Sequence, residues 1–149
     1  MIFAQKMHKV FIQGPIDSKF IQESITKHGS KTDIGAHCIF LGQVRADNIN
    51  NNTVLGIEYS AYEELAIKTF NEIKEECFKK FDISCLHIFH SLGYVKAGEI
   101  SLFVFVSSKH RKSSFDACEW LVEEIKKRVP VYGKEILDND GYKWKENLF

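Results

Sequence analysis

Several features that would place this chain in a specialised class are missing from its 149 residues. It has only 2 prolines and 9 glycines, and its hydrophobic fraction of 44% is too high for a disordered chain. No apolar run is long enough to span a bilayer. The balance of 20 basic and 20 acidic residues argues against a general nucleic-acid-binding protein. We therefore expect one globular domain over residues 1–149, because a chain of about this length can bury roughly 70% of its unfolded surface.

Signals for secretion and for disulfide formation are also missing. Lys6, His8 and Lys9 interrupt the N-terminal segment, and no small-residue cleavage site follows them, so a cytoplasmic location is expected. No two cysteines form a CxxC pair. Reduced core cysteines are therefore expected rather than disulfides, and these residues are Cys38, Cys77, Cys85 and Cys118.

The motifs of common enzyme families are absent: the chain has no GxGxxG, Walker-type GKS/T, HExxH or GxSxG. The closest approach to a metal-ligand cluster is formed by Cys85, His87 and His90. On a strand, however, Cys85 and His87 would point to one face and His90 to the other. No metal site is therefore expected. Cys118 is not expected to act as a nucleophile, because it falls on the apolar stripe of a predicted helix.

Hydrophobic periodicity and turn residues predict alternating strands and helices. A short helix is expected from an Asp17 or Ser18 cap to about residue 27. Two long helices are expected, one opened by a capping box over 60–63 and one running from near His110 to Pro130. Turns or loops are expected over 47–52, 93–98 and 139–141. The remaining strands give an α+β fold with mixed or antiparallel sheets, and they are predicted over 9–13, 34–44, 54–59, 83–90, 100–106, 131–137 and 142–144.

The same periodicity predicts which residues form the core. The strand over 100–106 is apolar on both faces, which indicates a central position in the sheet. In the strand over 54–59, Leu55, Ile57 and Tyr59 are expected on one face. Each long helix has one apolar stripe: the first comprises Tyr62, Ala66, Phe70, Ile73 and Cys77, and the second Phe115, Cys118, Leu121 or Val122, Ile125 and Val129.

Basic residues gather at the ends of the predicted elements. The run 109–112 opens the second long helix, where free backbone N–H groups and the helix dipole favour an anion. The run 126–128 ends that helix, Lys134 follows Pro130, and Arg45 closes a strand. Together these cations could bind a phosphorylated ligand. Alternatively, the run 126–128 simply complements the helix dipole and remains solvated. The residues alone leave both interpretations open.

An ordered set of short motifs resembles the large, catalytic subunit family of molybdopterin synthase. The resemblance extends from about residue 8 to residue 145. No single motif is specific, but their order is, especially His-Arg opening a helix before Lys, Pro and Lys-Glu. The matching positions are Gly35-Ala36, Phe40, Gly42, Val44-Arg45, Ile57-Glu58-Tyr59, Tyr62, His90, Gly93, Gly98-Glu99, Ser108, His110-Arg111, Phe115, Lys126, Pro130, Lys134-Glu135, Gly141 and Trp144.

This resemblance implies an α/β hammerhead-like fold and a sulfurtransferase activity. Such enzymes convert cyclic pyranopterin monophosphate (precursor Z) into the dithiolene molybdopterin, in molybdenum cofactor biosynthesis. The sulfur arrives as a thiocarboxylate on the C-terminal Gly-Gly of a small ubiquitin-like partner subunit. The present chain ends in Asn-Leu-Phe, so it is not expected to be that carrier. A homodimer within a heterotetramer is expected, and no cofactor.

The resemblance also assigns candidate roles by position. Lys126 is the first choice for catalysis and Lys134 the second. The expected substrate contacts are Gln43, Val44, Arg45, His110, Arg111, Lys126, Gly133, Lys134 and Glu135.

Three positions depart from the family pattern. Gly133 replaces the expected second catalytic lysine, Ser91 replaces an arginine, and no arginine follows Trp144. Strand alternation sends residues 133 and 134 to opposite faces, so Lys134 would need a bulge or a positive φ at Gly133 to reach the site. A distortion at Gly133 is therefore expected. If it is absent, Lys134 would pair with an acidic neighbour and Lys126 would act alone.

A second chain is also expected to complete the site. His110 and Lys126 lie about 24 Å apart along one helix, so a single pterin phosphate cannot reach both within one chain. The competing functional hypothesis is a non-catalytic module that binds an anion or a partner's tail in the same pocket.

Overall fold

A computed structural model describes residues 10–146, which form three α-helices, one 3-10 helix and eight strands. The α-helices are α2 (Ser18–Lys27), α3 (Glu63–Lys80) and α4 (Arg111–Arg128), and η2 (His28–Ser30) is the 3-10 helix. The strands are β1 (Phe11–Gln13), β2 (Ala36–Gln43), β3 (Asn48–Ile49), β4 (Asn52–Ala61), β5 (Cys85–Lys96), β6 (Ile100–Ser108), β7 (Val131–Leu137) and β8 (Tyr142–Trp144). The predicted α+β class is confirmed. Lys6, His8 and Lys9 lie outside the described residues.

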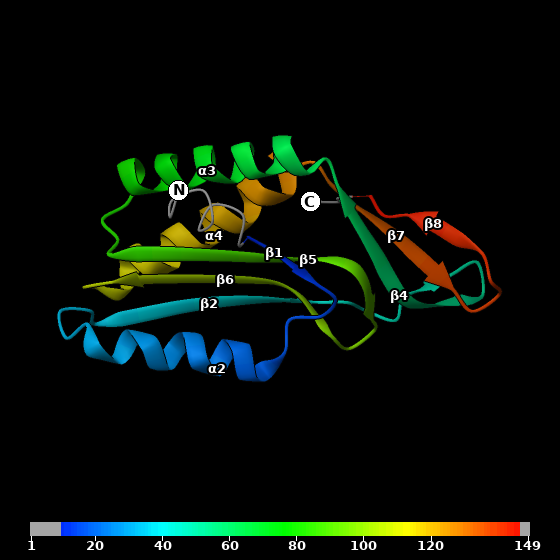
Figure 1. Cartoon of the computed structure of the whole chain (residues 1–149), viewed down its shortest axis with the longest axis horizontal. Helices are drawn as coiled ribbons and strands as arrows, with labels where there is room; N and C mark the ends of the chain where they lie inside the picture. The colour runs from blue at the N-terminus through cyan, green and yellow to red at the C-terminus, as the bar shows by residue number, and fades with distance from the viewer. Residues whose placement is uncertain (1–9, 147–149) are drawn as a thin grey trace.

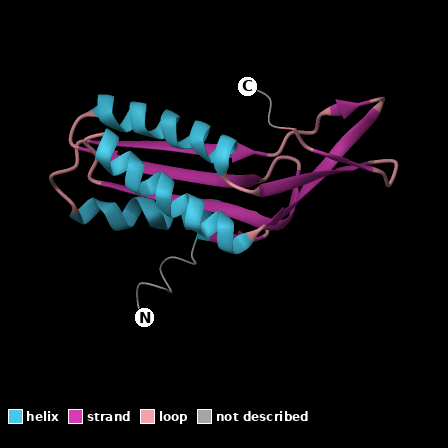
Figure 2. Ribbon diagram, turned by 90° about the horizontal axis from the view of Figure 1, so that it is seen from above, coloured by secondary structure: helices cyan, strands magenta, loops and turns pink. Residues whose placement is uncertain are grey.

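The strands form one mixed sheet in the order β2-β6-β5-β4-β7-β8, with β3 beside β4 and β1 beside β5. Only the β1–β5 pair is parallel among the described strand pairs. Helices α3 and α4 cover one face of the β2-β6-β5 half, and α2 covers the other (Figures 1 and 2). The strands β4, β7 and β8 extend beyond the helices to one side. The sheet therefore has a covered half and a projecting half.

The two halves are joined through β5, the longest strand. Its first part pairs with β6 as far as His90, and its last part pairs with β4 from Gly93 to Lys96. The strand changes partner at Gly93, whose φ of +82° is a conformation that L side chains rarely adopt. The turn is therefore shorter than the expected 93–98. Strand β5 continues through residue 96, and the chain turns at 97–98.

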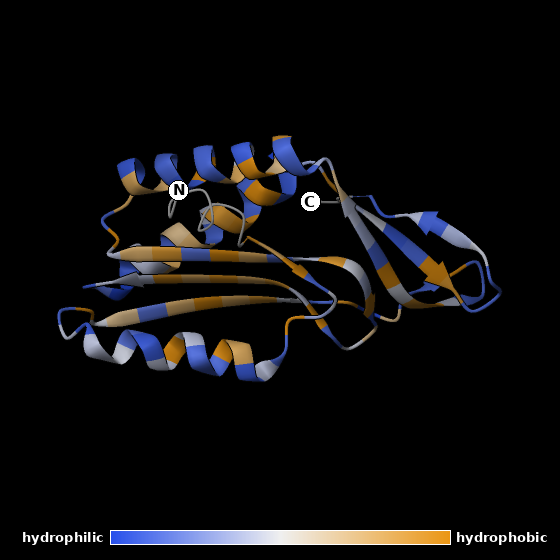
Figure 3. Cartoon of the chain, in the orientation of Figure 1, coloured by the Kyte–Doolittle hydropathy of each residue, from blue (hydrophilic) through white to orange (hydrophobic). Residues whose placement is uncertain are grey.

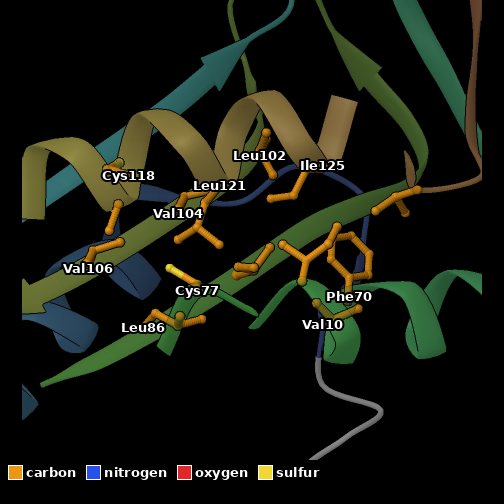
Figure 4. Packing of buried hydrophobic residues seen from close by; sticks show 14 of the residues in the cluster. Val10, Phe70, Cys77, Leu86, Leu102, Val104, Val106, Cys118, Leu121 and Ile125 are labelled. Atoms are coloured by element: carbon orange, nitrogen blue, oxygen red, sulfur yellow. The ribbon is translucent and has the colours of Figure 1, made fainter. Parts of the chain in front are cut away.

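The largest core cluster lies between the sheet and the helices α3 and α4. It brings Phe70 and Cys77 of α3 against Leu121 and Ile125 of α4 and the inner side chains of β5 and β6 (Figure 4). A second cluster, around Phe103 and Phe105, lies under α2. Figure 3 shows that the central strands are largely hydrophobic, whereas the side of α3 that faces away from the sheet is largely hydrophilic. The central position of β6 is confirmed, since β2 and β5 flank it.

Two predicted stripe residues are not buried. Phe115 is 60% exposed, because the buried stripe of α4 passes through Ser114, Cys118 and Leu121. Phe115 lies about 100° around the helix from Ser114. Tyr62 is 63% exposed, because it is the N-cap of α3 and precedes the first helical turn. Helical spacing therefore does not apply to it.

The predicted capping box over 60–63 is wrong. Ser60 and Ala61 continue β4 and pair with β7, and the Tyr62 N–H donates to the Pro130 carbonyl. Helix α3 begins at Glu63 with no side-chain cap. Pairing with a distant strand has replaced the local cap. Leu55 also departs from the prediction, since a register shift between Val54 and Gly56 leaves it 48% exposed instead of on one face with Ile57.

Other local predictions are confirmed. All four cysteines are free, as expected, but only Cys77 and Cys118 are buried in the core, whereas Cys38 and Cys85 are half-buried. Helix α2 begins after an Asp17 cap whose side chain accepts from the Phe20 N–H. The segment 47–52 forms a tight hairpin, with positive φ at Asn50 and Asn51. Among the described residues, no helix has the length and apolar character needed to cross a membrane.

Candidate functional site

A cavity of about 580 Å³ lies where the covered and projecting halves of the sheet meet. It is formed by the end of β2, the start of β6, the middle of β4 and β5, the C-terminal end of α4 and the β7–β8 hairpin. Its lining residues are Phe40, Leu41, Gly42, Gln43, Val44, Arg45, Ile57, Tyr59, His90, Ser101, Leu102, Ile125, Lys126, Lys127, Val129, Val131, Tyr132, Gly133, Trp144 and Lys145. Of the predicted site residues, the cavity brings together Gln43, Val44, Arg45, Lys126 and Gly133.

The segment 43–45 forms one wall of the cavity and is fixed by backbone hydrogen bonds. The Val44 N–H donates to the Glu99 carbonyl over 3.0 Å, and the Gly98 N–H donates to the Val44 carbonyl over 2.8 Å. Val44 is buried, and a register shift between Gly42 and Gln43 ends the regular pairing of β2. The Arg45 guanidinium bonds both carboxylate oxygens of Asp47, at 3.1 and 3.2 Å. The Arg45 guanidinium therefore places a positive charge on this wall. Asp47 fixes its position, and it remains exposed to solvent.

The basic run at the end of α4 separates into different roles. Arg128 lies 2.7 Å from Glu76 of α3, and Lys127 lies 3.7 Å from Glu124. Arg128 therefore ties the two long helices together. Lys126 lines the cavity and remains exposed to solvent. Desolvation by the surrounding protein lowers the pKa of Lys126, and the charges of Lys145 and Arg45 lower it further. A lysine in such surroundings can accept or release a proton more readily than an ordinary surface lysine.

The floor of the cavity is polar and carries an uncharged histidine. His90 is buried, and its Nδ1–H donates to the Ser91 carbonyl over 2.8 Å, which leaves Nε2 as a lone-pair acceptor. Burial lowers the pKa of His90 to about 4, and the charge of Lys126 adds to this effect. The Tyr59 ring packs edge-on against His90, and its hydroxyl lies 3.0 Å from Ser101 Oγ. Tyr59 and Ser101 were not among the predicted site residues.

Acidification is expected to destabilise the protein through His90. A histidine in the unfolded chain titrates near its ordinary pKa of 6.5, whereas the folded chain lowers the pKa of His90 to about 4. Between these values the unfolded state binds more protons, so the free energy of unfolding falls as the pH falls. We expect urea unfolding to show a loss of about 2 kcal/mol from this residue between about pH 7 and about pH 5.

The matched variant for this measurement is His90→Asn, which keeps a donor beside the Ser91 carbonyl but cannot titrate. Its stability should fall less over the same pH range. An equal fall in the variant and the original chain would show that other groups cause the acid sensitivity.

The distortion expected at Gly133 is absent. Gly133 pairs with Tyr59 in regular register, and positive φ values occur at Gly14, Gly93 and Gly98 instead. Lys134 therefore points away from this cavity. Its Nζ lies 4.3 Å from the ring centroid of Tyr142, so it makes a cation–π contact in place of the expected acidic partner.

The structure supplies a different cation beside Gly133. The Lys145 N–H donates to the Gly133 carbonyl over 2.7 Å, just beyond β8. A Cβ atom placed on Gly133 would lie 3.6 Å from Lys145 Cβ and 3.1 Å from Ile57 Cγ2. Lys145 thus enters the cavity next to the place where the family pattern has a lysine. The sequence reasoning missed Lys145, although Trp144 immediately before it was part of the resemblance.

The remaining predicted residues do not line this cavity. His110 is the N-cap of α4 and Arg111 its first residue, at the opposite end of the helix from Lys126 (Figure 1). Both side chains are exposed. Glu135 is buried on β7, on the same side of the strand as Gly133, and its charge raises the pKa of Arg45 after the larger effects of Asp47. Within one chain, the site is an open cationic cavity without its predicted His-Arg pair.

Comparisons with known proteins agree with these features. A family model described as MoaE protein matches residues 12–128. The chain is 42% identical over 117 residues to the molybdopterin synthase catalytic subunit of Pyrococcus abyssi, covering 78% of each. It is 46% identical over 116 residues to molybdopterin synthase catalytic subunit 1 of Aedes aegypti, covering 76% of this chain and 74% of the relative.

Solved structures extend the similarity to the fold. The crystal structure of molybdopterin synthase from Staphylococcus aureus aligns with a TM-score of 0.81 and 30% identity, covering 94% of this chain and 98% of that one. A complex of subunits 1 and 2 of molybdopterin-converting factor from Helicobacter pylori aligns with a TM-score of 0.76 and 25% identity, covering 92% and 89%. This chain therefore belongs to the MoaE protein family.

Proposed function

We propose that this chain is the catalytic subunit of a molybdopterin synthase, which transfers sulfur to cyclic pyranopterin monophosphate to form the molybdopterin dithiolene. The observation that carries the proposal is the placement of Arg45, Lys126 and Lys145 around one cavity in a chain of zero net charge. A phosphorylated pterin needs cations for its phosphate and polar partners for its ring. The cavity offers both, and family membership supplies the reaction.

Some side chains of the cavity are suited to bind the substrate, and others are suited to take part in the reaction. Arg45 is held by Asp47 at the rim, where its charge can attract a phosphate. Lys126 has a lowered pKa, so it can both stabilise charge that develops during sulfur transfer and exchange a proton. Neutral His90 can accept a hydrogen bond through Nε2. None of these steps requires a cysteine of this chain, because the sulfur would arrive on the partner.

The sulfur donor that we infer is a small ubiquitin-like subunit with a C-terminal Gly-Gly thiocarboxylate. The Helicobacter pylori complex, which contains two different subunits, supports a partner of this kind. Two copies of each subunit would make a heterotetramer. The four free cysteines support a cytoplasmic location, where thiols stay reduced.

A turnover assay separates this proposal from a non-catalytic binding module. The chain is mixed with a thiocarboxylated small subunit and precursor Z, and molybdopterin is measured. Product that depends on both components is expected. Binding of the small subunit or the precursor without product would contradict the proposed activity and favour the binding module.

We also propose that His110 and Arg111 act on the cavity of a second copy of the chain. Helix α4 separates them from Lys126 by about 24 Å, so one ligand cannot reach both within one chain. Arg111→Ala and Lys126→Ala are each expected to lose most activity. When the two variants are mixed in equal amounts and exchange subunits, about half of the dimers are mixed, and each mixed dimer has one intact site out of two. About a quarter of the original activity should therefore return.

Sedimentation of the same samples tests the dimer directly. Mixed variants that exchange subunits but recover no activity would show that Arg111 does not serve a neighbouring cavity. A chain that sediments only as a monomer while fully active would contradict the shared site altogether.

A further inference from the structure

Three potential metal ligands meet on the face of the sheet that α2 covers, outside the residues that line the cavity. They are His28, Cys85 and His87, and one ligand atom from each lies within 4.8 Å of the others. His28 is buried, and the other two side chains are half-buried. The Cys85 thiol is free. Two imidazoles and a thiol form a donor set that suits zinc and similar transition metals.

The fold gathers these residues from segments that are far apart in the sequence. Cys85 and His87 are alternate residues of β5, so they share one face of the strand. His90 lies on the other face, in contact with Phe11 and Tyr59. The third donor is His28 instead, which directly follows α2. Strand β5 therefore separates His90 from Cys85 and His87, with which the sequence grouped it. Tertiary packing brings His28 to these two residues instead.

The hydrogen bonds of His28 fix its imidazole ring in an orientation that suits a metal ligand. Its Nδ1–H donates to the Ser24 carbonyl over 2.7 Å, so its Nε2 carries a lone pair. That lone pair faces Nε2 of His87 at 3.1 Å. Two nitrogens bound to one tetrahedral zinc at 2.0–2.1 Å lie about 3.3–3.4 Å apart. The two imidazoles therefore need only a small adjustment to share an ion.

The surroundings hold the cluster in place. The His28 ring stacks on Phe105, with centroids 4.6 Å apart and an interplanar angle of 26°. Burial lowers the pKa of His87 to about 4, and the charges of His28, Lys31 and Lys74 lower it further. Helix α2 has no buried residue of its own, so an ion on His28 would fasten its C-terminal end to β5.

We propose that His28, Cys85 and His87 bind one divalent transition-metal ion of the zinc type, with water in the fourth position. The site is separate from the synthase cavity, so activity is not its readout. Without an ion, the short Nε2–Nε2 contact would be explained by a single hydrogen bond from His87 to His28. That simpler arrangement is the alternative which the experiment must be able to detect.

The probe is Co²⁺ added to the full chain after treatment with chelator and reductant. We expect one Co²⁺ per chain, with the absorption of a tetrahedral ion and a thiolate-to-cobalt charge-transfer band. Zn²⁺ should displace it and raise Tm, because a ligand that binds only the folded state stabilises it. Cys85→Ser should abolish the charge-transfer band and weaken binding by more than about 100-fold, since even an outer partner of a ligand is worth about 10–100-fold.

Cys38→Ser is the matched control, because it removes another half-buried thiol that packs against the core on the opposite side of the sheet. It should retain the spectrum and the affinity. Circular dichroism confirms that each variant is folded, and His87→Gln provides a second test if Cys85→Ser is not. The proposal is overturned if the original chain binds no Co²⁺ with a thiolate band, or if folded Cys85→Ser or His87→Gln keeps that band and affinity.

Discussion

Replacing Lys126 with alanine is expected to remove most of the molybdopterin-forming activity while leaving the protein folded. Lys126 lines the cavity at the end of α4, but the adjacent Ile125 supplies the core packing. The lost group would otherwise stabilise negative charge as sulfur is transferred. Removal of one preorganised donor costs about 100- to 1,000-fold in turnover in other enzymes. A loss of that size in product formed per enzyme is the expected result.

Lys79→Ala is a suitable control, because Lys79 lies in the last turn of the other long helix and outside the cavity. It removes an exposed cation from an equivalent helix position and should leave turnover unchanged. Both variants should unfold within about 0.5 kcal/mol of the original chain, as surface substitutions usually do. Near-normal turnover in folded Lys126→Ala would exclude Lys126 from catalysis.

Local sequence patterns were sufficient to predict most of the elements. Asp17 satisfies an N–H at the start of α2, Pro130 follows the end of α4, and residues 139–141 turn β7 into β8. Each of these signals acts over a few residues. The failed capping box at 60–63 shows the limit of such signals. There, β7 pairs with Ser60 and Ala61, and that pairing is a contact between residues far apart in the sequence.

The same distinction explains the site. The place of Lys126 at the end of α4 could be predicted, because hydrophobic spacing and Pro130 fix where that helix ends, whereas its choice as a catalytic residue came from the family resemblance. Lys145 could not be predicted, because its position beside Gly133 depends on the register of β7 against β8 and on how that hairpin folds over the cavity. His28 is comparable, since it meets His87 only after α2 packs on the sheet. In each of the two missed cases, the decisive contact joins segments whose pairing is set by tertiary structure.

Replacing Lys145 is expected to produce the second large loss of activity. Gly133 leaves the β7 wall without a side chain, and Lys145 enters the cavity beside it. Its charge also helps to lower the pKa of Lys126. Lys145→Met keeps most of the side-chain length but removes the charge. We expect its turnover to fall by about 10- to 100-fold, a smaller loss than the roughly 100- to 1,000-fold expected for a preorganised donor, because Lys126 remains in the cavity.

The pKa of Lys126 provides an independent readout of the same change. Removal of a neighbouring positive charge favours the charged form of Lys126, so its pKa should rise in Lys145→Met. The pH dependence of turnover should then move to higher pH. The pKa of Lys126 itself can be followed by NMR after the lysines are methylated with isotope-labelled methyl groups. Lys145→Arg retains the charge and should leave the Lys126 pKa and most of the activity in place.

Lys134→Ala completes this comparison, because Lys134 was the lysine expected from the sequence to replace the one missing at 133. In the structure it lies over Tyr142, away from the cavity of its own chain. Turnover and precursor affinity should therefore be unchanged in Lys134→Ala and reduced in Lys145→Met. The reverse result, with Lys134→Ala impaired and Lys145→Met normal, would contradict the role assigned to Lys145. That result would mean that the outer face of the β7–β8 hairpin contacts the substrate. A neighbouring chain would then have to supply the rest of the site.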